Sequence, residues 1–262
     1  MKVCVLGSGS KGNCTYIEGD KSKILIDCGL SCLDAIERLK SIDVNPQEID
    51  AILVTHEHSD HIKGVGSFAK KFGTQIISHN ACMQKVVNRS DYLSITNYKD
   101  CFDGDFFIKD LTITSFAVPH DVAHCSGFSV YNNGKKVTIA TDLGEMQDSI
   151  FDNLKESDLV ILESNHDPDL LKANIHYPAY LKKRILSNVG HLSNQACGDT
   201  ILKLAKCDTL KFVLAHLSQE NNTSDIARLN VQRILNENGL TDKDYFLEIA
   251  SQTKRSSMIE IK

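Results

Sequence analysis

Three histidines and an aspartate crowd into six consecutive positions directly after the apolar run Ala51–Thr55. In an extended turn His56 and His58 face the same way, while Asp60 and His61 begin the helical pattern that follows. Imidazole and carboxylate ligands together suit Zn, Mn or Fe. A lone histidine would fit a solvated polar loop, but four ligands at this density predict a metal site between a buried strand and a helix.

Short, mostly β-branched apolar runs recur along the chain and predict strands. They are Val3–Leu6, Ile24–Asp27, Ala51–Thr55, Gln75–Ser78, Leu111–Ala117, Val137–Thr141, Leu159–Glu163, Phe212–Ala215 and Tyr245–Ile249. Helical patterns lie between several of them, at Leu33–Ile42, Ile62–Phe72, Tyr180–Leu186, Asn194–Ala205 and Ser224–Asn238. This order fits mixed sheets with helices on their outer faces, an α+β fold. No composition break marks a boundary, so we expect a single domain over residues 1–262.

The segment Gly7–Gly12 matches the G-x-G-x-x-G pattern of dinucleotide-binding proteins and has an acid downstream at Asp27. That pattern must open a helix whose N-terminus holds the pyrophosphate. Here Cys14–Glu18 and Lys23–Asp27 both read as strands of a hairpin. We therefore expect a glycine turn and no nucleotide cofactor, although the turn's N–H groups could still bind a phosphate.

Three further candidate ligands each follow a predicted strand: His120, Asp142 and His216. The ends of sheet strands commonly carry ligands and catalytic groups. Each residue also has a plainer explanation when taken alone. Asp142 could cap a turn, and His216 could be a hydrogen-bonded core histidine.

Taken together, these residues resemble the metallo-β-lactamase superfamily, whose motif order is Asp, H-x-H-x-D-H, His, Asp, His. The resemblance implies an αβ/βα sandwich of two mixed sheets flanked by helices, with two divalent metal ions. The resemblance implies that the first ion is held by His56, His58 and His120 and the second by Asp60, His61 and His216. It also implies that Asp142 bridges the two ions and that Asp27 orients a ligand imidazole.

Glu163 ends a predicted strand, and His191 precedes a helix shortly before His216. This pair resembles the phosphodiesterase and nuclease branch, in which a Glu–His pair that binds no metal lies between the bridging Asp and the last ligand. The alternative for His191 is a helix-start turn capped by Ser193 or Asn194. The interval from Asp142 to His216 is too short for the inserted domain of β-CASP nucleases. No counterpart of the long arm of ribonuclease Z is apparent either, so processing of transfer RNA is not expected.

Seven short strings resemble the YycJ/WalJ family of compact bacterial proteins. They are SGSxGN (Ser8–Asn13), HEHSDHIKG (His56–Gly64), PHD (Pro119–Asp121), TDLG (Thr141–Gly144), ESNHD (Glu163–Asp167), GHLSN (Gly190–Asn194) and HLSxENN (His216–Asn222). That family is associated with metal-dependent 5′-to-3′ exonuclease action on DNA, which implies a DNA substrate, with a 5′ phosphate as the expected end. The candidate substrate-binding residues are Ser8, Ser10, Asn13, Ser193, Asn194 and Ser218.

For such a substrate, the expected catalytic residues are Asp60, Glu163 and His191. A hydroxide held between the two ions would attack phosphorus, because bound metal lowers the pKa of water to about 7. His191, positioned by Glu163, would protonate the leaving 3′ oxygen as general acid.

Three rival functions remain open. A thioester or lactone hydrolase of the same fold is disfavoured by the Glu163–His191 pair, since a thiolate needs little protonation on leaving. A small-molecule phosphodiesterase is harder to separate from a nuclease. A metal-dependent binding module without catalysis is disfavoured by the complete ligand set.

The formal net charge is −5, which counts against a broad nucleic-acid surface. Any basic groove must be local, at Lys182–Arg184 or at Lys254 and Arg255, although solvated faces explain these runs more simply. The chain shows no signal-peptide pattern and no apolar run long enough to span a bilayer. Its nine cysteines are scattered singly, as in proteins that keep their thiols reduced. We therefore expect a cytoplasmic protein; the oligomeric state is left open.

Overall fold

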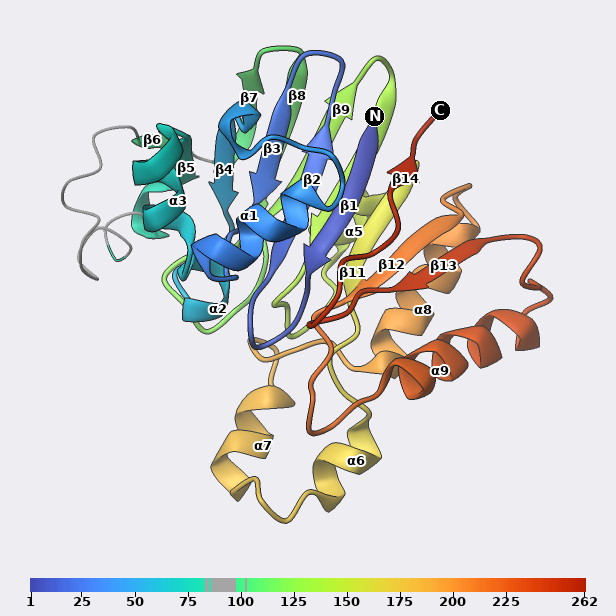
Figure 1. Ribbon diagram of the computed structural model, residues 1–262. Coiled ribbons are helices and arrows are strands. Elements are labelled where there is room, and N and C mark those ends of the chain that lie inside the picture. Colours follow the sequence, from blue (N-terminus) through green and yellow to red (C-terminus); the bar gives the residue numbers. More distant parts are fainter. Residues whose placement is uncertain (83–84, 86–97, 102) are drawn as a thin grey trace.

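The computed structural model describes residues 1–82, 85, 98–101 and 103–262, and within them two mixed sheets of seven strands pack face to face (Figure 1). The first sheet has the order β14-β1-β2-β3-β4-β5-β6 and the second the order β13-β12-β11-β10-β9-β8-β7. Each sheet has three antiparallel pairings on one side and three parallel pairings on the other. The carboxyl ends of the parallel strands therefore meet at one edge of the sandwich.

The strands of the first sheet are β1 Lys2–Gly7, β2 Cys14–Glu18, β3 Lys23–Ile26, β4 Ala51–Val54, β5 Gln75–His79, β6 Tyr98–Cys101 and β14 Ile259–Glu260. Those of the second are β7 Gly104–Ile108, β8 Leu111–Ala117, β9 Ser126–Asn132, β10 Lys135–Ala140, β11 Leu159–Glu163, β12 Lys211–Ala215 and β13 Phe246–Ile249. The helices are α1 Cys32–Lys40, η1 (a 3-10 turn) Pro46–Glu48, α2 Ser59–Ile62, α3 Val65–Phe72, α5 Asp148–Leu154, α6 Pro168–Ala173, α7 Ala179–Ile185, α8 Asn194–Ala205 and α9 Ser224–Glu237.

The alternation of side chains along the strands builds three apolar layers. In β3, Ile24 and Ile26 point into the layer between the sheets, where they meet residues of the second sheet such as Ile161. Leu25 points outward and joins the layer under α1 and α3, which includes Phe68. A third layer joins the outer face of the second sheet to α5, α8 and α9. All of this places helices outside both sheets and confirms the predicted fold class.

The glycine-rich turn is confirmed as part of a hairpin. Val3 of β1 pairs antiparallel with Ile17 of β2, and no helix intervenes between the two strands. The prediction of a single domain over residues 1–262 stays a prediction.

Several elements escaped the sequence analysis. The apolar runs of the sequence did not predict β7 or β9. The strand β9 (SGFSVYN) mixes small and polar residues, although it is almost wholly buried. The predicted helix Ile62–Phe72 is broken into α2 and α3 around Gly64. A Cβ on Gly64 would lie 2.4 Å from the carbonyl oxygen of Leu30, so the chain passes too close there for a larger residue.

The helical pattern at Tyr180–Leu186 is confirmed as α7, but the protrusion that α7 forms with α6 was not predicted. The helices α6 and α7 project from the edge of the sandwich, below both sheets in Figure 1. They lie within the interval between Asp142 and His216, where the sequence analysis found no arm. Within the described part of the chain, every helix is too short or too polar to cross a lipid bilayer.

Candidate metal centre

The predicted ligands gather at the edge where the parallel strands end. His56 and His58 follow β4 of the first sheet, and His120 follows β8 of the second. Asp142 follows β10 and His216 follows β12. Thus residues separated by up to 160 positions in the sequence meet at one edge because both sheets place strand ends there.

Sharp backbone turns bring the chain to this edge. Asp27, Asp142 and His216 all have positive φ angles, of 58°, 59° and 55° respectively. Residues other than glycine rarely adopt this conformation, which here is stabilised by buried side-chain contacts. Asp27 and Asp142 occupy similar places, one and two residues after the strand at which the sheet changes from antiparallel to parallel pairing.

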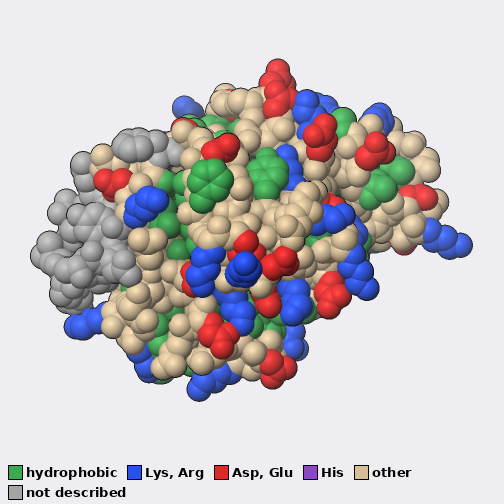
Figure 2. Space-filling view, turned by 90° about the horizontal axis from the view of Figure 1, so that it is seen from above, with side chains coloured by type: hydrophobic (Ala, Val, Ile, Leu, Met, Phe, Trp, Pro, Cys, Tyr) green, Lys and Arg blue, Asp and Glu red, His purple; other side chains and the backbone are tan. Residues whose placement is uncertain are grey.

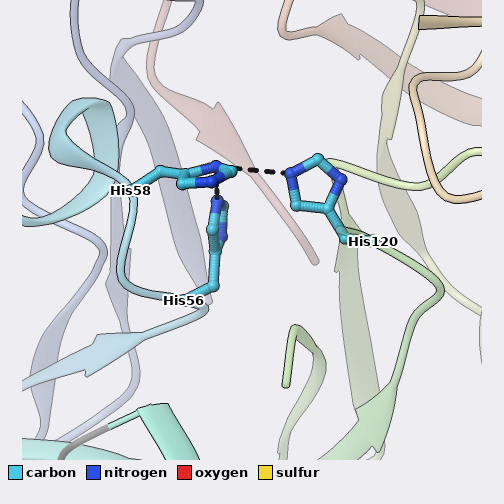
Figure 3. A group of neighbouring side chains, drawn as sticks. All are labelled: His56, His58 and His120. Carbon is cyan, nitrogen blue, oxygen red and sulfur yellow. Dashed lines mark hydrogen bonds between the residues drawn. The ribbon is translucent and has the colours of Figure 1, made fainter. Parts of the chain in front are cut away.

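The first triad is His56, His58 and His120, whose rings point toward one another in Figure 3. Nε2 of His56 lies 3.0 Å from Nδ1 of His58, and Nε2 of His120 lies 3.4 Å from the same atom. Three imidazole nitrogens that face each other so closely repel through their lone pairs unless something positive is shared among them. This arrangement therefore suits a cation.

The second triad is Asp60, His61 and His216. Oδ2 of Asp60 lies 3.6 Å from Nε2 of His61 and 3.4 Å from Nε2 of His216. Asn13 closes one side of this triad, because its Nδ2 lies 3.0 Å from Nε2 of His61 and 3.3 Å from the backbone oxygen of Asp60.

Asp142 lies between the two triads. Its Oδ2 is 3.2 Å from Nε2 of His61, and its Oδ1 is 3.5 Å from Nε2 of His216 and 3.9 Å from Nε2 of His120. Oδ2 is buried without a well-formed hydrogen bond to any described residue. An orphaned buried carboxylate oxygen between two groups of nitrogen ligands fits a pair of divalent cations.

Outer partners fix which nitrogen of each ring faces the centre. Nδ1 of His61 donates to Asp27 at 2.7 Å, and Nδ1 of His120 donates to the carbonyl oxygen of Gly190 at 3.2 Å. Nδ1 of His56 contacts the hydroxyl of Thr55 at 3.0 Å. Such outer contacts set the tautomer of a ligand imidazole and leave its second nitrogen for the metal.

The electrostatics of the two triads differ. Burial and the neighbouring imidazoles lower the pKa of His56, His58 and His120, so their rings are neutral at pH 7, the form that binds metal. Burial also opposes the protonated form of His61 and His216. The surrounding carboxylates outweigh it, raising the pKa of His61 to about 10 and that of His216 well above its ordinary value.

Glu163 and His191 lie beside this centre. Nδ1 of His191 donates to Oε1 of Glu163 at 2.8 Å, and the same oxygen accepts from Nδ1 of His216 at 2.9 Å. Oε2 of Glu163 accepts the backbone N–H groups of Leu143 and Leu192. Burial favours the neutral acid, but the imidazoles of His191 and His216 outweigh it and lower the pKa of Glu163 to about 2. Glu163 is thus a fixed carboxylate at neutral pH.

Comparison with known proteins agrees with this geometry. Residues 7–216 match the family model described as the metallo-beta-lactamase superfamily. The chain belongs to this superfamily. The strand order and the clustered ligands accord with that membership, which identifies the chain as a metal-dependent hydrolase.

Two curated relatives align with this chain over most of their length. It is 36% identical over 244 residues to "Exodeoxyribonuclease YycJ" of Bacillus anthracis, a match that covers 91% of this chain and 90% of the relative. It is also 36% identical to "Exodeoxyribonuclease WalJ" of Streptococcus pneumoniae, covering 88% and 87% of the two chains. The resemblance to the YycJ/WalJ family is therefore confirmed.

A solved structure supports the same fold. The metallo-beta-lactamase fold protein YhfI from Bacillus subtilis matches with a TM-score of 0.71 at 20% sequence identity. The match covers 97% of this chain and 98% of that chain. At this identity the similarity concerns the fold alone.

A cavity of about 200 Å³ opens onto the candidate metal centre. Ligands of both triads line it together with His191, Asn165 and residues of α7. Of the predicted substrate-binding residues, Ser10 and Ser218 line this cavity.

The other four predicted substrate-binding residues are engaged within the protein. Ser8 is buried and its hydroxyl accepts the backbone N–H of His216 at 2.7 Å, while Asn13 contacts the second triad. Ser193 caps α8 by accepting the N–H of Ala196, the alternative that was kept open for this turn. Asn194 is fully buried, and its amide bonds Ser164 and Asn222. These contacts explain the four residues without a substrate.

Sequence reasoning missed several residues of the site. Thr55 contacts Asp27, His56 and His61, and its place directly before the first ligand histidine was an available signal. Asn165 donates to the backbone oxygen of His216 at 2.8 Å. Nothing local in the sequence predicted this contact, because 51 positions separate the two residues.

Proposed function

We propose that the chain is a two-metal phosphodiester hydrolase that removes nucleotides from DNA in the 5′-to-3′ direction. The observation that carries this proposal is 36% identity, over about nine-tenths of both chains, with an exodeoxyribonuclease. The two triads support the same conclusion, because His58, Asp60, His120 and His216 line one cavity together with Asp142.

Two divalent cations of the Zn, Mn or Fe type fit the donors present. His56, His58 and His120 would hold the first, Asp60, His61 and His216 the second, and Asp142 faces both groups. Cations in such a site supply a nucleophile from water at neutral pH and neutralise the charge of a phosphate.

The protein's own part in the chemistry centres on His191. Because Nδ1 is held by Glu163, Nε2 is the nitrogen left to meet a substrate atom. Burial disfavours the protonated ring, yet Glu163 outweighs it and raises the pKa of His191. A protonated ring at the cavity wall can give its proton to the leaving 3′ oxygen as a general acid. Glu163 holds the ring in place and stabilises its positive charge.

Asp60 also lines the cavity and serves the reaction there. Its carboxylate keeps a lowered pKa, because hydrogen bonding to His216 and the charge of His61 outweigh its burial. As an ionised oxygen acceptor at the cavity surface, it can orient an attacking water in addition to binding a cation.

A second candidate is a phosphodiesterase acting on small molecules. The cavity of about 200 Å³ is small for more than one nucleotide, and the net charge of −5 does not favour a polyanion. This candidate uses the same residues and differs only in substrate.

The deciding experiment pairs metal analysis of the purified protein with digestion of double-stranded DNA labelled at one end. Matched substrates with a 5′ phosphate and a 5′ hydroxyl are incubated with added Mn²⁺. About two metals per chain and stepwise loss from the 5′ end are expected. Two metals with hydrolysis of small diesters alone would favour the second candidate. Equal rates on the two DNA ends would remove the 5′ phosphate as a recognised group.

A further inference from the structure

The protrusion formed by residues 167–189, hereafter the arm, contains α6 and α7 and a connection between them. The two helices stand apart from the sandwich in Figure 1. The arm is anchored at its base, where the backbone N–H of Asp167 donates to the oxygen of Asn221 and the amide of Asn174 bonds the side chain of Asn221 at 2.8 Å.

The arm exposes apolar and aromatic side chains to an unusual degree. None of the residues of α7 is buried. Ile175 is 89% exposed and Tyr180 is 76% exposed. A helix of seven residues with no buried face gains little from packing, so its apolar surface needs another explanation. Exposed apolar groups gathered in one segment commonly mark a place of interaction.

The arm is also locally basic in an acidic protein. Its 23 positions hold four Lys or Arg residues and two Asp residues, whereas the whole chain has a formal charge of −5. Lys172 pairs with Asp169, and Arg184 pairs with Asp121 outside the arm. Lys183 is exposed and forms no ion pair with any residue that the structure describes.

The opposite end of the molecule provides a contrast. Figure 2 views the molecule from the end farthest from the arm, and there basic and acidic side chains lie intermingled. Lys23, for example, pairs with Glu48, and Lys109 pairs with Asp50. These two lysines are thus each paired with a carboxylate, unlike Lys183.

The surface of the arm continues directly into the metal cavity. Tyr177 and Arg184 line that cavity. The backbone N–H of His191 donates to the oxygen of Ile185 at 3.0 Å. A Cβ on Gly190 would lie 2.2 Å from that same oxygen, so this position accepts only glycine without rearrangement. The end of α7 is therefore fixed against the segment that carries His191.

We propose that the arm is a platform for a single nucleic-acid strand whose end lies in the metal cavity. A base would stack on Tyr180, and Lys183 would contact a phosphate of the strand. Aromatic stacking combined with isolated positive charge is how single strands are bound without sequence preference. The proposal rests on the proposed function for its ligand and adds a binding surface that the ligand motifs do not contain.

The test measures binding apart from cleavage. Metal-loaded protein is titrated into a fluorescent, phosphorothioate-protected single-stranded oligonucleotide, and affinity is followed by anisotropy at several salt concentrations. Tyr180→Ala should weaken binding about tenfold, and Tyr180→Phe should restore it, because stacking needs the ring and not the hydroxyl. Lys183→Ala should lower the slope of log affinity against log salt by about 0.7. The matched controls, Phe107→Ala and Lys243→Ala, alter an exposed aromatic and an exposed lysine elsewhere.

Cleavage is measured in parallel to separate the two proposals. The ratio of kcat/KM on unprotected DNA to kcat/KM on bis(p-nitrophenyl) phosphate should fall about tenfold in Tyr180→Ala, through KM rather than kcat. Oligonucleotide binding that depends on Tyr180 in a protein that does not cleave DNA would remove the nuclease function and leave the platform. DNA cleavage with unaltered binding in both arm variants would overturn the platform alone. A dimer in sedimentation that Tyr180→Ala dissociates, with DNA binding unchanged, would instead assign the arm to a second copy of the chain.

Discussion

Glu163 contacts His216 as closely as it contacts His191. Oε1 of Glu163 lies 2.9 Å from Nδ1 of His216 and 2.8 Å from Nδ1 of His191. One carboxylate oxygen thus orients both a candidate metal ligand and the candidate general acid. The sequence predicted a contact of Glu163 with His191 alone. The contact of Glu163 with His216, a residue of the second triad, was not predicted.

Glu163→Gln should therefore impair metal binding as well as catalysis. Replacing one carboxylate oxygen with an amide nitrogen removes the negative charge and puts a donor opposite donors in either orientation, because one oxygen faces two Nδ1–H groups and the other faces two backbone N–H groups. Loss of an outer partner of this kind typically lowers metal affinity by about 10- to 100-fold. Competition with a chelator, together with turnover on a phosphodiester, measures both effects. Normal metal affinity in this variant would show that the contact with His216 does not support the ligand.

His191→Ala should lose activity while retaining its metals. The ring faces the cavity, and its Nδ1 is bound to Glu163. Removing a general acid costs about 10²- to 10⁴-fold in rate. The loss should be much smaller with p-nitrophenyl leaving groups than with DNA, because nitrophenolate leaves without a proton. Metal content and the two rates are measured on the same preparation.

Asp142→Ala provides the contrasting variant. Its carboxylate faces nitrogens of both triads, so its removal should release metal together with activity. If His191→Ala also sheds metal, His191 is a ligand and the general-acid role assigned to it is wrong.

Metal loading at pH 7 should release about two protons, both from the second triad. The lowered pKa values of His56, His58 and His120 leave these rings neutral, whereas His61 (pKa about 10) and His216 carry protons in the metal-free protein. Calorimetric titration with Zn²⁺ in buffers of different ionisation enthalpy counts the protons released.

The same pKa values fix how the stability of the metal-free protein depends on pH. Because the pKa values of His61 and His216 are raised in the folded state, the stability that these two residues contribute is complete below pH 6.5, the ordinary pKa of histidine. It is lost as the pH rises toward about 10, the pKa of His61. Melting temperatures of chelator-treated protein should fall across that range, and a constant melting temperature would contradict the assignment.

Gly29→Ala should disturb the second triad without touching a ligand. A Cβ at this position would lie 1.6 Å from the carbonyl oxygen of Asp60, so the turn that carries Asp60 must move. Overpacking of this kind costs about 1–3 kcal/mol of stability. Metal content should fall below two per chain.

Gly239→Ala is the matched control for this substitution. Its backbone is strained for alanine, with φ at 84°, but the added Cβ meets open space. It should lower the melting temperature and leave the metal content unchanged.

The sequence predicted the parts of the site that follow from strand ends. His56, His58, Asp60 and His61 are close in the chain, and the fold class explains why His120 and His216 join them. Most strands were predictable because their buried residues form short apolar runs in the sequence. Strands such as β9, which lack an apolar run, were not.

The contacts of polar side chains with distant residues were not predictable in the same way. Asn194 was expected to bind substrate, yet it is fully buried and bonds Asn222, 28 positions away. An amide in a loop carries no local signal of whether its partner is a ligand or another amide. In the arm, α7 was predicted as the helical pattern Tyr180–Leu186, but α6 and the protrusion itself were not. A helical pattern does not show whether its helix packs against the sheets or stands apart from them.

Each triad draws its ligands from both sheets, and this has a mechanical consequence. His58 and His120 are 62 positions apart, and Asp60 and His216 are 156 apart. A cation bound to either triad would act as a cross-link between the two halves of the sandwich. Chelation should then loosen the seam between the sheets as well as stop hydrolysis, and amide hydrogen exchange should accelerate on both sides of that seam together.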